Sequence, residues 1–318
     1  MGKYYIGIDL GGTNIAAGVV SEQGELLSTH VIPTMRERTY KEIAKDMYLA
    51  AFFAAEKVKL TLNDFDYIGV GTPGWENPKT GNIVYSNSLC WINVPLHREL
   101  EKLFNKKILI RNDGDCALLG EVVSGAAKNH KNVIMLTLGT GVGGGILLNG
   151  KLYSGADRMG GELGHMSINP NGNLCSCGKR GCLESHSSAN ALINEVRRAS
   201  QMHPESSILS FCDNNIDNIN GKTVFDAAKA GDAVALNIVD TYIEYLAYGI
   251  STLITVFRPE VVVLGGGICN QGSYLLDRLN DKVQKLSYAS EYIGVPKVIT
   301  AKHRSEAGII GAALLERY

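Results

Sequence analysis

The sequence predicts an α/β protein built from two similar halves, and two observations indicate this. Strand-like apolar runs alternate with segments of helical periodicity along the 318 residues. A pattern of strand, glycine-rich turn and strand occurs at residues 4–20 and again at residues 133–148. The two copies lie much farther apart than the repeats of roughly 20–50 residues that build solenoids. We therefore expect a duplicated α/β unit.

The first half is expected to begin with a β-hairpin. Residues 4–10 and 15–20 are apolar and flank a glycine turn, which predicts a hairpin rather than a strand-to-helix loop. The elements expected next are a strand at 26–32, a helix at 40–59, strands at 67–71 and 108–110, and a helix at 117–123.

The second half is expected to repeat this opening and then become mostly helical. Its strands at 133–138 and 146–148 flank a second glycine turn. The expected later elements are helices at 188–200 and 224–253, an exposed loop at 213–220, a strand at 261–264, and a helix at 306–317. The Ala307-Gly308 pair should let this last helix pack closely on another element.

The composition favours a soluble globular protein, with 45% hydrophobic and 20% charged residues. The net charge of −1 argues against a nucleic-acid partner, because such binders usually carry a basic excess. No apolar stretch approaches the roughly 20 residues that span a bilayer, and no signal peptide precedes the first strand. We therefore expect a cytoplasmic protein with no nucleic-acid and no membrane partner.

One short segment has the composition of a metal site, since it contains His165, Cys175, Cys177 and Cys182. Three thiolates and one imidazole are the ligands of a closed tetrahedral zinc site, whereas incidental buried cysteines need not cluster. Four protein ligands leave no open position, so the metal is interpreted as structural. The remaining cysteines show no disulfide pattern, which favours a reducing compartment. They are Cys90, Cys116, Cys212 and Cys269.

Glycine clusters follow three strands, at residues 11–12, 139–145 and 265–267. Glycine lets backbone N–H groups approach phosphate oxygens without a side chain in the way. No cluster is a Walker A loop, because no Gly-Lys-Ser/Thr follows, and none opens a helix directly like the dinucleotide fingerprint. Tight hairpins also use glycine, but three clusters that each end an apolar strand favour nucleotide binding.

Acidic residues lie beside these features. Asp9 precedes the first glycine turn, where a carboxylate commonly holds Mg²⁺ through water, although it could also be an ordinary turn residue. Asp113 follows a strand and could accept a proton from a hydroxyl, or it could equally be a helix N-cap. Asp115 competes for either role. Glu162 and Glu184 flank the cysteine segment, so a metal there would fix them relative to each other.

These motifs together resemble the ROK sugar kinases (repressor, open reading frame, kinase) of the actin/hexokinase-like ATPase superfamily. The resemblance covers essentially the whole chain, and residues 155–184 carry its most specific part, the family signature with its zinc motif. Residues 138–145 are similar to the family's second phosphate loop, and residues 263–267 to its adenosine loop. The length and the full zinc motif are most similar to the bacterial ROK glucokinases.

The resemblance implies two actin-like ATPase domains of the ribonuclease H type, with a cleft between them and a zinc-binding loop in the larger one. The small N-terminal domain is expected to cover residues 1–118, with the C-terminal helix 304–318 packing back on it. The large domain is expected to cover residues 119–303. Because family members often form dimers or tetramers, a homo-oligomer is expected.

The resemblance also implies roles for single residues, with Asp113 as the catalytic base. The residues expected to bind sugar are Asn87, Asn112, Asp113, Glu162, His165 and Glu184. Those expected to bind nucleotide are Asp9, Gly11, Gly12, Thr13, Asn14, Gly139, Thr140, Gly141, Gly265, Gly266 and Gly267. The metal ligands are His165, Cys175, Cys177 and Cys182, and the cofactors are ATP, Mg²⁺ and structural Zn²⁺.

Two positions depart from the family pattern. Many relatives read Asn-Asp-Ala-Asn where this chain has Asn112-Asp113-Gly114-Asp115, and the added carboxylate could raise the pKa of its neighbour if the side chains converge. His186 replaces a residue that is usually small and close to the sugar.

The activity implied by the resemblance is ATP-dependent phosphorylation of a hexose at its 6-hydroxyl, with glucose as the expected sugar. A fructokinase and an N-acetylmannosamine or N-acetylglucosamine kinase stay open. A sugar-responsive repressor would need a DNA-binding winged helix, and the residues before Asp9 are too few for one. Loss of the metal should weaken sugar binding and leave nucleotide affinity nearly unchanged, because the glycine clusters lie elsewhere in the sequence.

Overall fold

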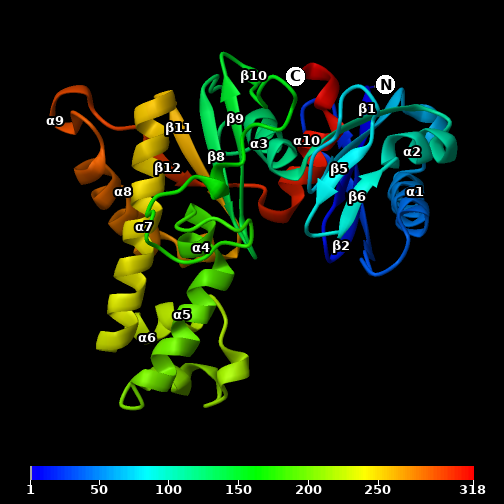
Figure 1. The fold of residues 1–318 in the computed structure, drawn as a ribbon. Helices are drawn as coiled ribbons and strands as arrows, with labels where there is room; N and C mark the ends of the chain where they lie inside the picture. The colour runs from blue at the N-terminus through cyan, green and yellow to red at the C-terminus, as the bar shows by residue number, and fades with distance from the viewer. Residues whose placement is uncertain (1) are drawn as a thin grey trace. The chain divides into compact units, whose positions relative to one another are not determined.

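The computed structural model describes residues 2–318 and contains two five-stranded sheets with helices packed on them (Figure 1). The α/β class predicted from the sequence is confirmed. Contacts within the chain divide it into two compact units. Unit 1 comprises the residues up to Val133, residues 145–161 and residues 301–318, and unit 2 comprises residues 134–144 and 162–300.

The sheet of unit 1 has the strand order β3-β2-β1-β4-β7. Its strands are β1 (Tyr4–Leu10), β2 (Asn14–Ser21), β3 (Leu26–Pro33), β4 (Tyr67–Thr72) and β7 (Lys107–Asn112). The predicted hairpin is confirmed, because β1 and β2 pair antiparallel from Tyr4 opposite Ser21 to Leu10 opposite Ile15. β4 pairs parallel with both β1 and β7, so the carboxyl ends of these three strands share one edge. Asp9 and Asn112 both lie at that edge.

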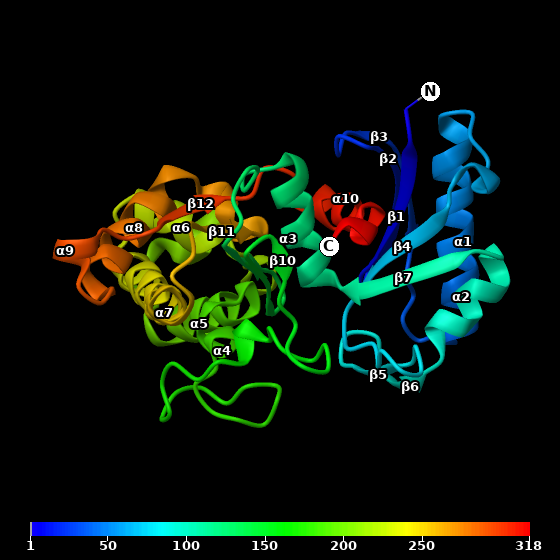
Figure 2. The same cartoon turned by 90° about the horizontal axis from the view of Figure 1, so that it is seen from above.

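Helices cover both faces of this sheet. They are α1 (Tyr40–Lys57), α2 (Leu96–Phe104), α3 (Asp113–Ser124) and α10 (Ala307–Ala313). α1 begins with a capping box between Thr39 and Glu42, and it buries an apolar stripe that includes Ile43 and Met47. Figure 2 shows α1 and α2 on one face of the sheet, and α3 and α10 on the other.

The close packing predicted for the C-terminal helix is present. A Cβ atom built on Gly7, Gly69 or Gly120 would lie within 2.2 Å of a backbone oxygen of α10, and one on Gly311 would lie 1.8 Å from the oxygen of Cys116. α10 is shorter than predicted, because the chain tightens into a 3-10 turn at Leu315–Arg317.

A short antiparallel hairpin that the sequence did not predict belongs to unit 1. Its strands are β5 (Ile83–Ser86) and β6 (Trp91–Val94). Strands of four residues carry too little periodicity to stand out from a loop. The turn of this hairpin contains Asn87.

The second sheet has the order β10-β9-β8-β11-β12, which repeats the pattern of the first and confirms the duplication. Its strands are β8 (Val133–Leu138), β9 (Val142–Leu148), β10 (Lys151–Leu152), β11 (Val261–Gly265) and β12 (Lys297–Thr300). The division between the two units falls within β9, after Gly144.

Unit 2 is completed by helices around the long α7, which packs with α4, α5, α6 and α8 (Figure 1). The helices are α4 (Leu183–Ser187), α5 (Ala189–Met202), α6 (Thr223–Lys229), α7 (Ala233–Phe257), α8 (Ser273–Leu286) and α9 (Ser290–Ile293). The helical segment predicted at 224–253 is confirmed, but it is interrupted once. Gly231 has φ 94° and Asp232 caps α7 by accepting the N–H of Ala235, so the segment forms two helices.

The two compact units differ from the domain limits expected at residues 118 and 303. Residue 118 lies inside α3, and residues 119–133, 145–161 and 301–303 have their contacts in unit 1. Compact units defined by contacts are not the same as domains, so the domain limits at residues 118 and 303 stay a prediction. Within residues 2–318, no helix is long and apolar enough to cross a membrane.

Candidate functional site

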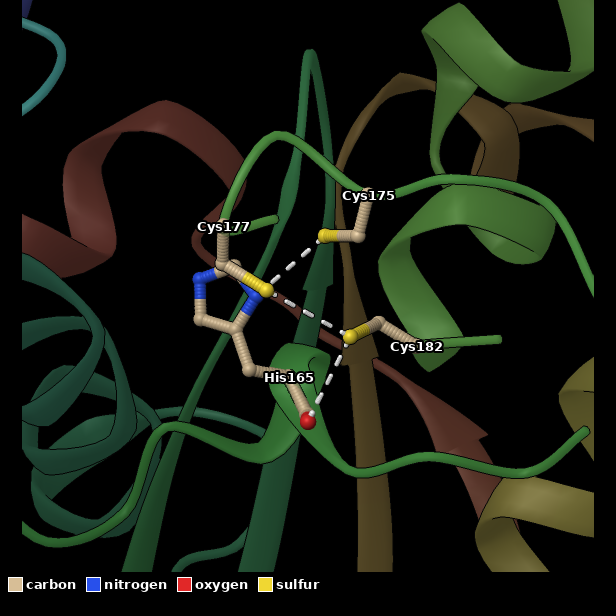
Figure 3. Close-up of side chains that lie close together, drawn as sticks. All are labelled: His165, Cys175, Cys177 and Cys182. Carbon is tan, nitrogen blue, oxygen red and sulfur yellow. Dashed lines mark hydrogen bonds between the residues drawn. The ribbon is translucent and has the colours of Figure 1, made fainter. Parts of the chain in front are cut away.

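The four predicted metal ligands converge in unit 2. One ligand atom from each of His165, Cys175, Cys177 and Cys182 lies within 4.8 Å of the others (Figure 3). The sulfur atoms of Cys177 and Cys182 are 3.6 Å apart, and the sulfur of Cys175 is 3.6 Å from Nδ1 of His165. Tetrahedral zinc with Zn–S bonds of about 2.3 Å would separate two sulfurs by about 3.8 Å. The residues therefore fit zinc in both chemistry and spacing.

Local turns bring these ligands together. Cys175 N–H donates to the carbonyl of Lys179 at 2.8 Å, and Gly178 N–H donates to the carbonyl of Cys175 at 3.0 Å. Gly178 has φ 85°, a conformation that favours glycine. A backbone N–H of Lys179 also lowers the pKa of the Cys177 thiol. The tight turn thus favours the thiolate that a metal requires.

Glu184 lies beside this cluster, on the first turn of α4. Its Oε1 accepts a hydrogen bond from the hydroxyl of Ser176 at 3.0 Å and is 3.7 Å from the sulfur of Cys175. Its Oε2 accepts from the backbone N–H of Val142 at 3.0 Å. The sequence did not predict Ser176 or Val142 as neighbours of Glu184, since nothing in their spacing marks them.

Glu162 and His165 flank a 3-10 turn at Leu163–His165 in the same unit. The N–H of His165 donates to the carbonyl of Glu162 at 3.0 Å. Within unit 2, one local turn therefore connects Glu162 to the metal cluster.

Two of the three glycine clusters lie side by side in unit 2. The second cluster follows β8 and the third follows β11, and these strands are neighbours in the sheet. A Cβ atom on Gly266 would lie 2.1 Å from the oxygen of Leu138, directly before the loop that contains Gly139, Thr140 and Gly141. Gly267 has nothing within 4 Å of its Cβ position, which leaves its backbone accessible. Gly265 is the last residue of β11.

The first glycine cluster forms the β1–β2 turn of unit 1. Gly11 N–H donates to the carbonyl of Asn14 at 2.9 Å, and the N–H of Thr34 donates to the carbonyl of Thr13 at 2.8 Å. A Cβ atom on Gly12 would lie 3.4 Å from the oxygen of Ser88, in the β5–β6 turn. The exposed Asn87 is thereby placed near this glycine turn.

Asp113 is the first residue of α3, and Asn112 is its N-cap. The side-chain oxygens of Asn112 and of Asp113 both accept from the N–H of Gly114, each at 2.9 Å. The amide of Asn112 also donates to the carbonyl of Gly74 at 3.4 Å. The alternative that Asp113 is itself the N-cap is therefore wrong. Its carboxylate lies in the first turn of α3.

Asp9 lies under α10 in the same unit. A Cβ atom on Gly308 would be 2.6 Å from its Oδ2. Burial, and to a smaller extent the charge of Asp113, raise the pKa of Asp9 to about 7. A cation bound at Asp9 would reverse both effects, because it stabilises the ionised carboxylate.

Asp115 and His186, the two residues that depart from the family pattern, both contact identified side chains or backbone groups. Asp115 is buried, and its Oδ2 accepts from the hydroxyl of Ser154 at 3.0 Å. The ring of His186 stacks on Tyr245, with centroids 4.1 Å apart, and Nε2 accepts the N–H of Asn173 at 3.3 Å. Burial lowers the pKa of His186. The effect of Asp115 on the pKa of Asp113 stays a prediction.

The chain is similar to known proteins over nearly its whole length. The model of the ROK family matches residues 5–318. The chain is 37% identical over 312 residues to a glucokinase of Thermotoga maritima, covering 97% of this chain and 95% of that protein. It is 33% identical over 323 residues to an N-acetyl-D-glucosamine kinase of Aliivibrio salmonicida, covering 98% and 99%. The solved structure of a ROK family glucokinase from Streptomyces griseus, in complex with glucose and AMPPNP, matches with a TM-score of 0.85, 32% identity and 98% coverage of both chains.

Proposed function

Because this chain belongs to the ROK family, we propose that it is an ATP-dependent glucokinase that phosphorylates glucose at its 6-hydroxyl. The observation that carries this proposal is the similarity to glucokinases over nearly the full length. It includes a solved relative whose complex holds both a sugar and an ATP analogue.

Asp113 is proposed as the catalytic base. Phosphoryl transfer depends mainly on alignment and on stabilising charge, while the base orients the attacking hydroxyl and finally takes its proton. The geometry at the start of α3 supports this role, because the N–H of Gly114 donates to the carboxylate of Asp113 and orients it. Asn112 and Asn87 are proposed to bind the sugar from the same unit.

Glu162 and Glu184 are proposed to accept hydrogen bonds from sugar hydroxyls, and the ring N–H of His165 is proposed to donate one to a sugar hydroxyl. His165, Cys175, Cys177 and Cys182 would hold a zinc ion, which would supply structural rigidity rather than a Lewis acid, since its four ligands are all protein atoms. In this proposal the metal cluster keeps the segment from Glu162 to Glu184 in a binding conformation.

The nucleotide is proposed to bind at the glycine clusters. Backbone N–H groups at residues 11–14 and 139–141 would contact phosphates, and residues 265–267 would contact the adenosine. Asp9 would hold Mg²⁺ through water. The raised pKa of Asp9 supports this role, because a buried carboxylate of that kind gains most from a nearby cation.

The identity of the sugar is the part of the proposal most open to test. The chain is as similar to the N-acetyl-D-glucosamine kinase as to a glucokinase of Streptomyces coelicolor, at 33% identity each. That similarity keeps an N-acetylhexosamine kinase as the second candidate. Fructose and N-acetylmannosamine are the further alternatives.

A coupled ADP-release assay would decide between these sugars. We expect the highest kcat/KM for glucose in a panel with mannose, fructose, N-acetylglucosamine, N-acetylmannosamine and allose. A higher value for an N-acetylhexosamine would replace glucose as the substrate, and no ADP release with any sugar would refute the kinase. We also propose a cytoplasmic homodimer or homotetramer, which light scattering of the purified protein would test.

A further inference from the structure

The loop between β8 and β9 contacts the segment that contains the metal ligands. We define the glycine loop as residues 139–144 and the metal segment as residues 162–189. A Cβ atom on Gly164 would lie 2.0 Å from the oxygen of Val142, so these backbones touch. The N–H of Ala189 donates to the carbonyl of Gly139 at 2.8 Å. Both ends of the metal segment therefore contact the glycine loop.

Glu184 connects the loop and the metal ligands directly. One carboxylate oxygen accepts from Val142 N–H and the other accepts from the Ser176 hydroxyl, each at 3.0 Å. Ser176 lies between two metal ligands in the sequence, and Glu184 follows a third, Cys182, by two positions. Hydrogen bonds to an ionised carboxylate are stronger than neutral ones, so this bridge resists rearrangement.

The glycine loop is shaped to accept this bridge. A Cβ atom on Gly141 would lie 2.4 Å from Oε2 of Glu184, so any larger residue would push the carboxylate away. The same loop is the one proposed to contact nucleotide phosphates. Its conformation thus depends on a side chain that belongs to the metal segment.

We propose that Glu184 is a positioning residue that couples the metal segment to the glycine loop, so that filling the metal site sets nucleotide affinity as well as sugar affinity. The proposal rests on the proposed function for the identity of the ligand at the loop. It revises the expectation from the sequence that metal loss leaves nucleotide affinity unchanged. Val142 and Glu184 are far apart in the sequence, so their contact could not be predicted before the fold was known.

The Ser176→Ala variant tests this coupling, because it removes one anchor of Glu184 without altering a metal ligand. Ser167→Ala is the matched control, since the Ser167 hydroxyl donates to the carbonyl of Arg180 within the same segment and not to Glu184. Both serines are exposed, so both variants should fold. In zinc-loaded protein with Mg²⁺, we expect Ser176→Ala to weaken the binding of AMPPNP by roughly three- to tenfold, which lies in the lower part of the range for coupled neighbouring groups. Ser167→Ala should leave that Kd unchanged.

Hydrogen exchange supplies a readout that needs no nucleotide. In Ser176→Ala and in Glu184→Gln, peptides that cover the glycine loop should exchange faster than in the wild type, while Ser167→Ala should match the wild type. If the wild type bound no AMPPNP but the loop still responded in this way, the proposed function would fail and the coupling would stand.

Metal removal and a double variant complete the test. Protein stripped of zinc by chelation and returned to buffer with Mg²⁺ should bind AMPPNP more weakly and show a deprotected loop, and Ser176→Ala should have little further effect in a Glu184→Gln background. Chelated protein that keeps both its AMPPNP affinity and its loop protection would overturn the proposal. Equal effects of Ser176→Ala and Ser167→Ala would overturn it too.

Discussion

The carboxylates of the two units are held in place by different means. In unit 1, Asp9 is enclosed by backbone packing, with Gly308 of α10 directly against its oxygens. In unit 2, Glu184 is held by hydrogen bonds from Ser176 and from the backbone of Val142. Packing of backbones in a core cannot be removed without disturbing the fold, whereas a polar cluster can be dismantled locally. The two units should therefore respond differently to the same kind of change.

The largest effect is expected from Asp113→Asn. This variant tests whether unit 1 keeps the arrangement of its sugar-binding residues when the charge of Asp113 is removed. Asparagine keeps the shape and the hydrogen bond to Gly114 N–H but loses the proton acceptor. We expect kcat to fall by roughly 10²–10⁴-fold while sugar affinity stays within a few-fold. Steady-state kinetics and sugar titration measure both quantities.

Asp115→Asn is the matched control, because it makes the same change two residues away at a carboxylate that contacts Ser154. Its effect on kcat should be much smaller. Near-normal turnover of Asp113→Asn would exclude Asp113 as the base, and a severe loss in Asp115→Asn alone would transfer the role to Asp115.

Gly311→Ala should disrupt the packing of α10 in unit 1. Alanine favours a helix by about 1 kcal/mol over glycine, but overpacking against a backbone costs about 3 kcal/mol. Because the new Cβ would lie 1.8 Å from the oxygen of Cys116, we expect a net loss of about 2 kcal/mol in the free energy of unfolding. Denaturant titration measures this loss. Gly267→Ala, whose Cβ meets nothing within 4 Å, should lose much less.

Cys177→Ser should disrupt the metal cluster of unit 2 and leave the packing of α10 in unit 1 intact. We expect the loss of about one zinc ion per chain, a lower melting temperature and a kcat/KM for sugar reduced on the order of 10²-fold, as for a positioning error near 1 Å. Elemental analysis and kinetics measure these changes, and hydrogen exchange should show α10 still protected. A wild type that is fully active without metal would contradict this account.

The last prediction is the pH dependence that Asp9 gives to the stability of unit 1. Its folded pKa of about 7 lies above the ordinary 3.8, so the folded state binds the proton more tightly than the unfolded state. Stability should therefore fall as the pH rises from about 4 through 7. Asp9→Asn should remove this dependence, so its melting temperature should exceed that of the wild type at pH 8 and match it at pH 4. Equal melting curves at pH 8 would show that Asp9 is not buried in this way.

The sequence alone determined the features that depend on neighbours along the chain. The β1–β2 hairpin follows from two apolar runs on either side of Gly11 and Gly12, and the metal cluster follows from ligands separated only by turns. The helix at α1 follows from its apolar stripe. Local sterics and hydrogen bonding specify such features before the chain packs.

Tertiary structure decided what depends on residues far apart in the sequence. Glu184 reaches Val142 only because α4 packs against the β8–β9 loop, and Asp9 acquires its raised pKa only under α10. The sequence predicted the helical segment at 224–253 but not its break at Gly231, because a glycine alone does not say whether a helix ends. Burial and contact distance are properties of the packed chain, so no spacing along the sequence could supply them.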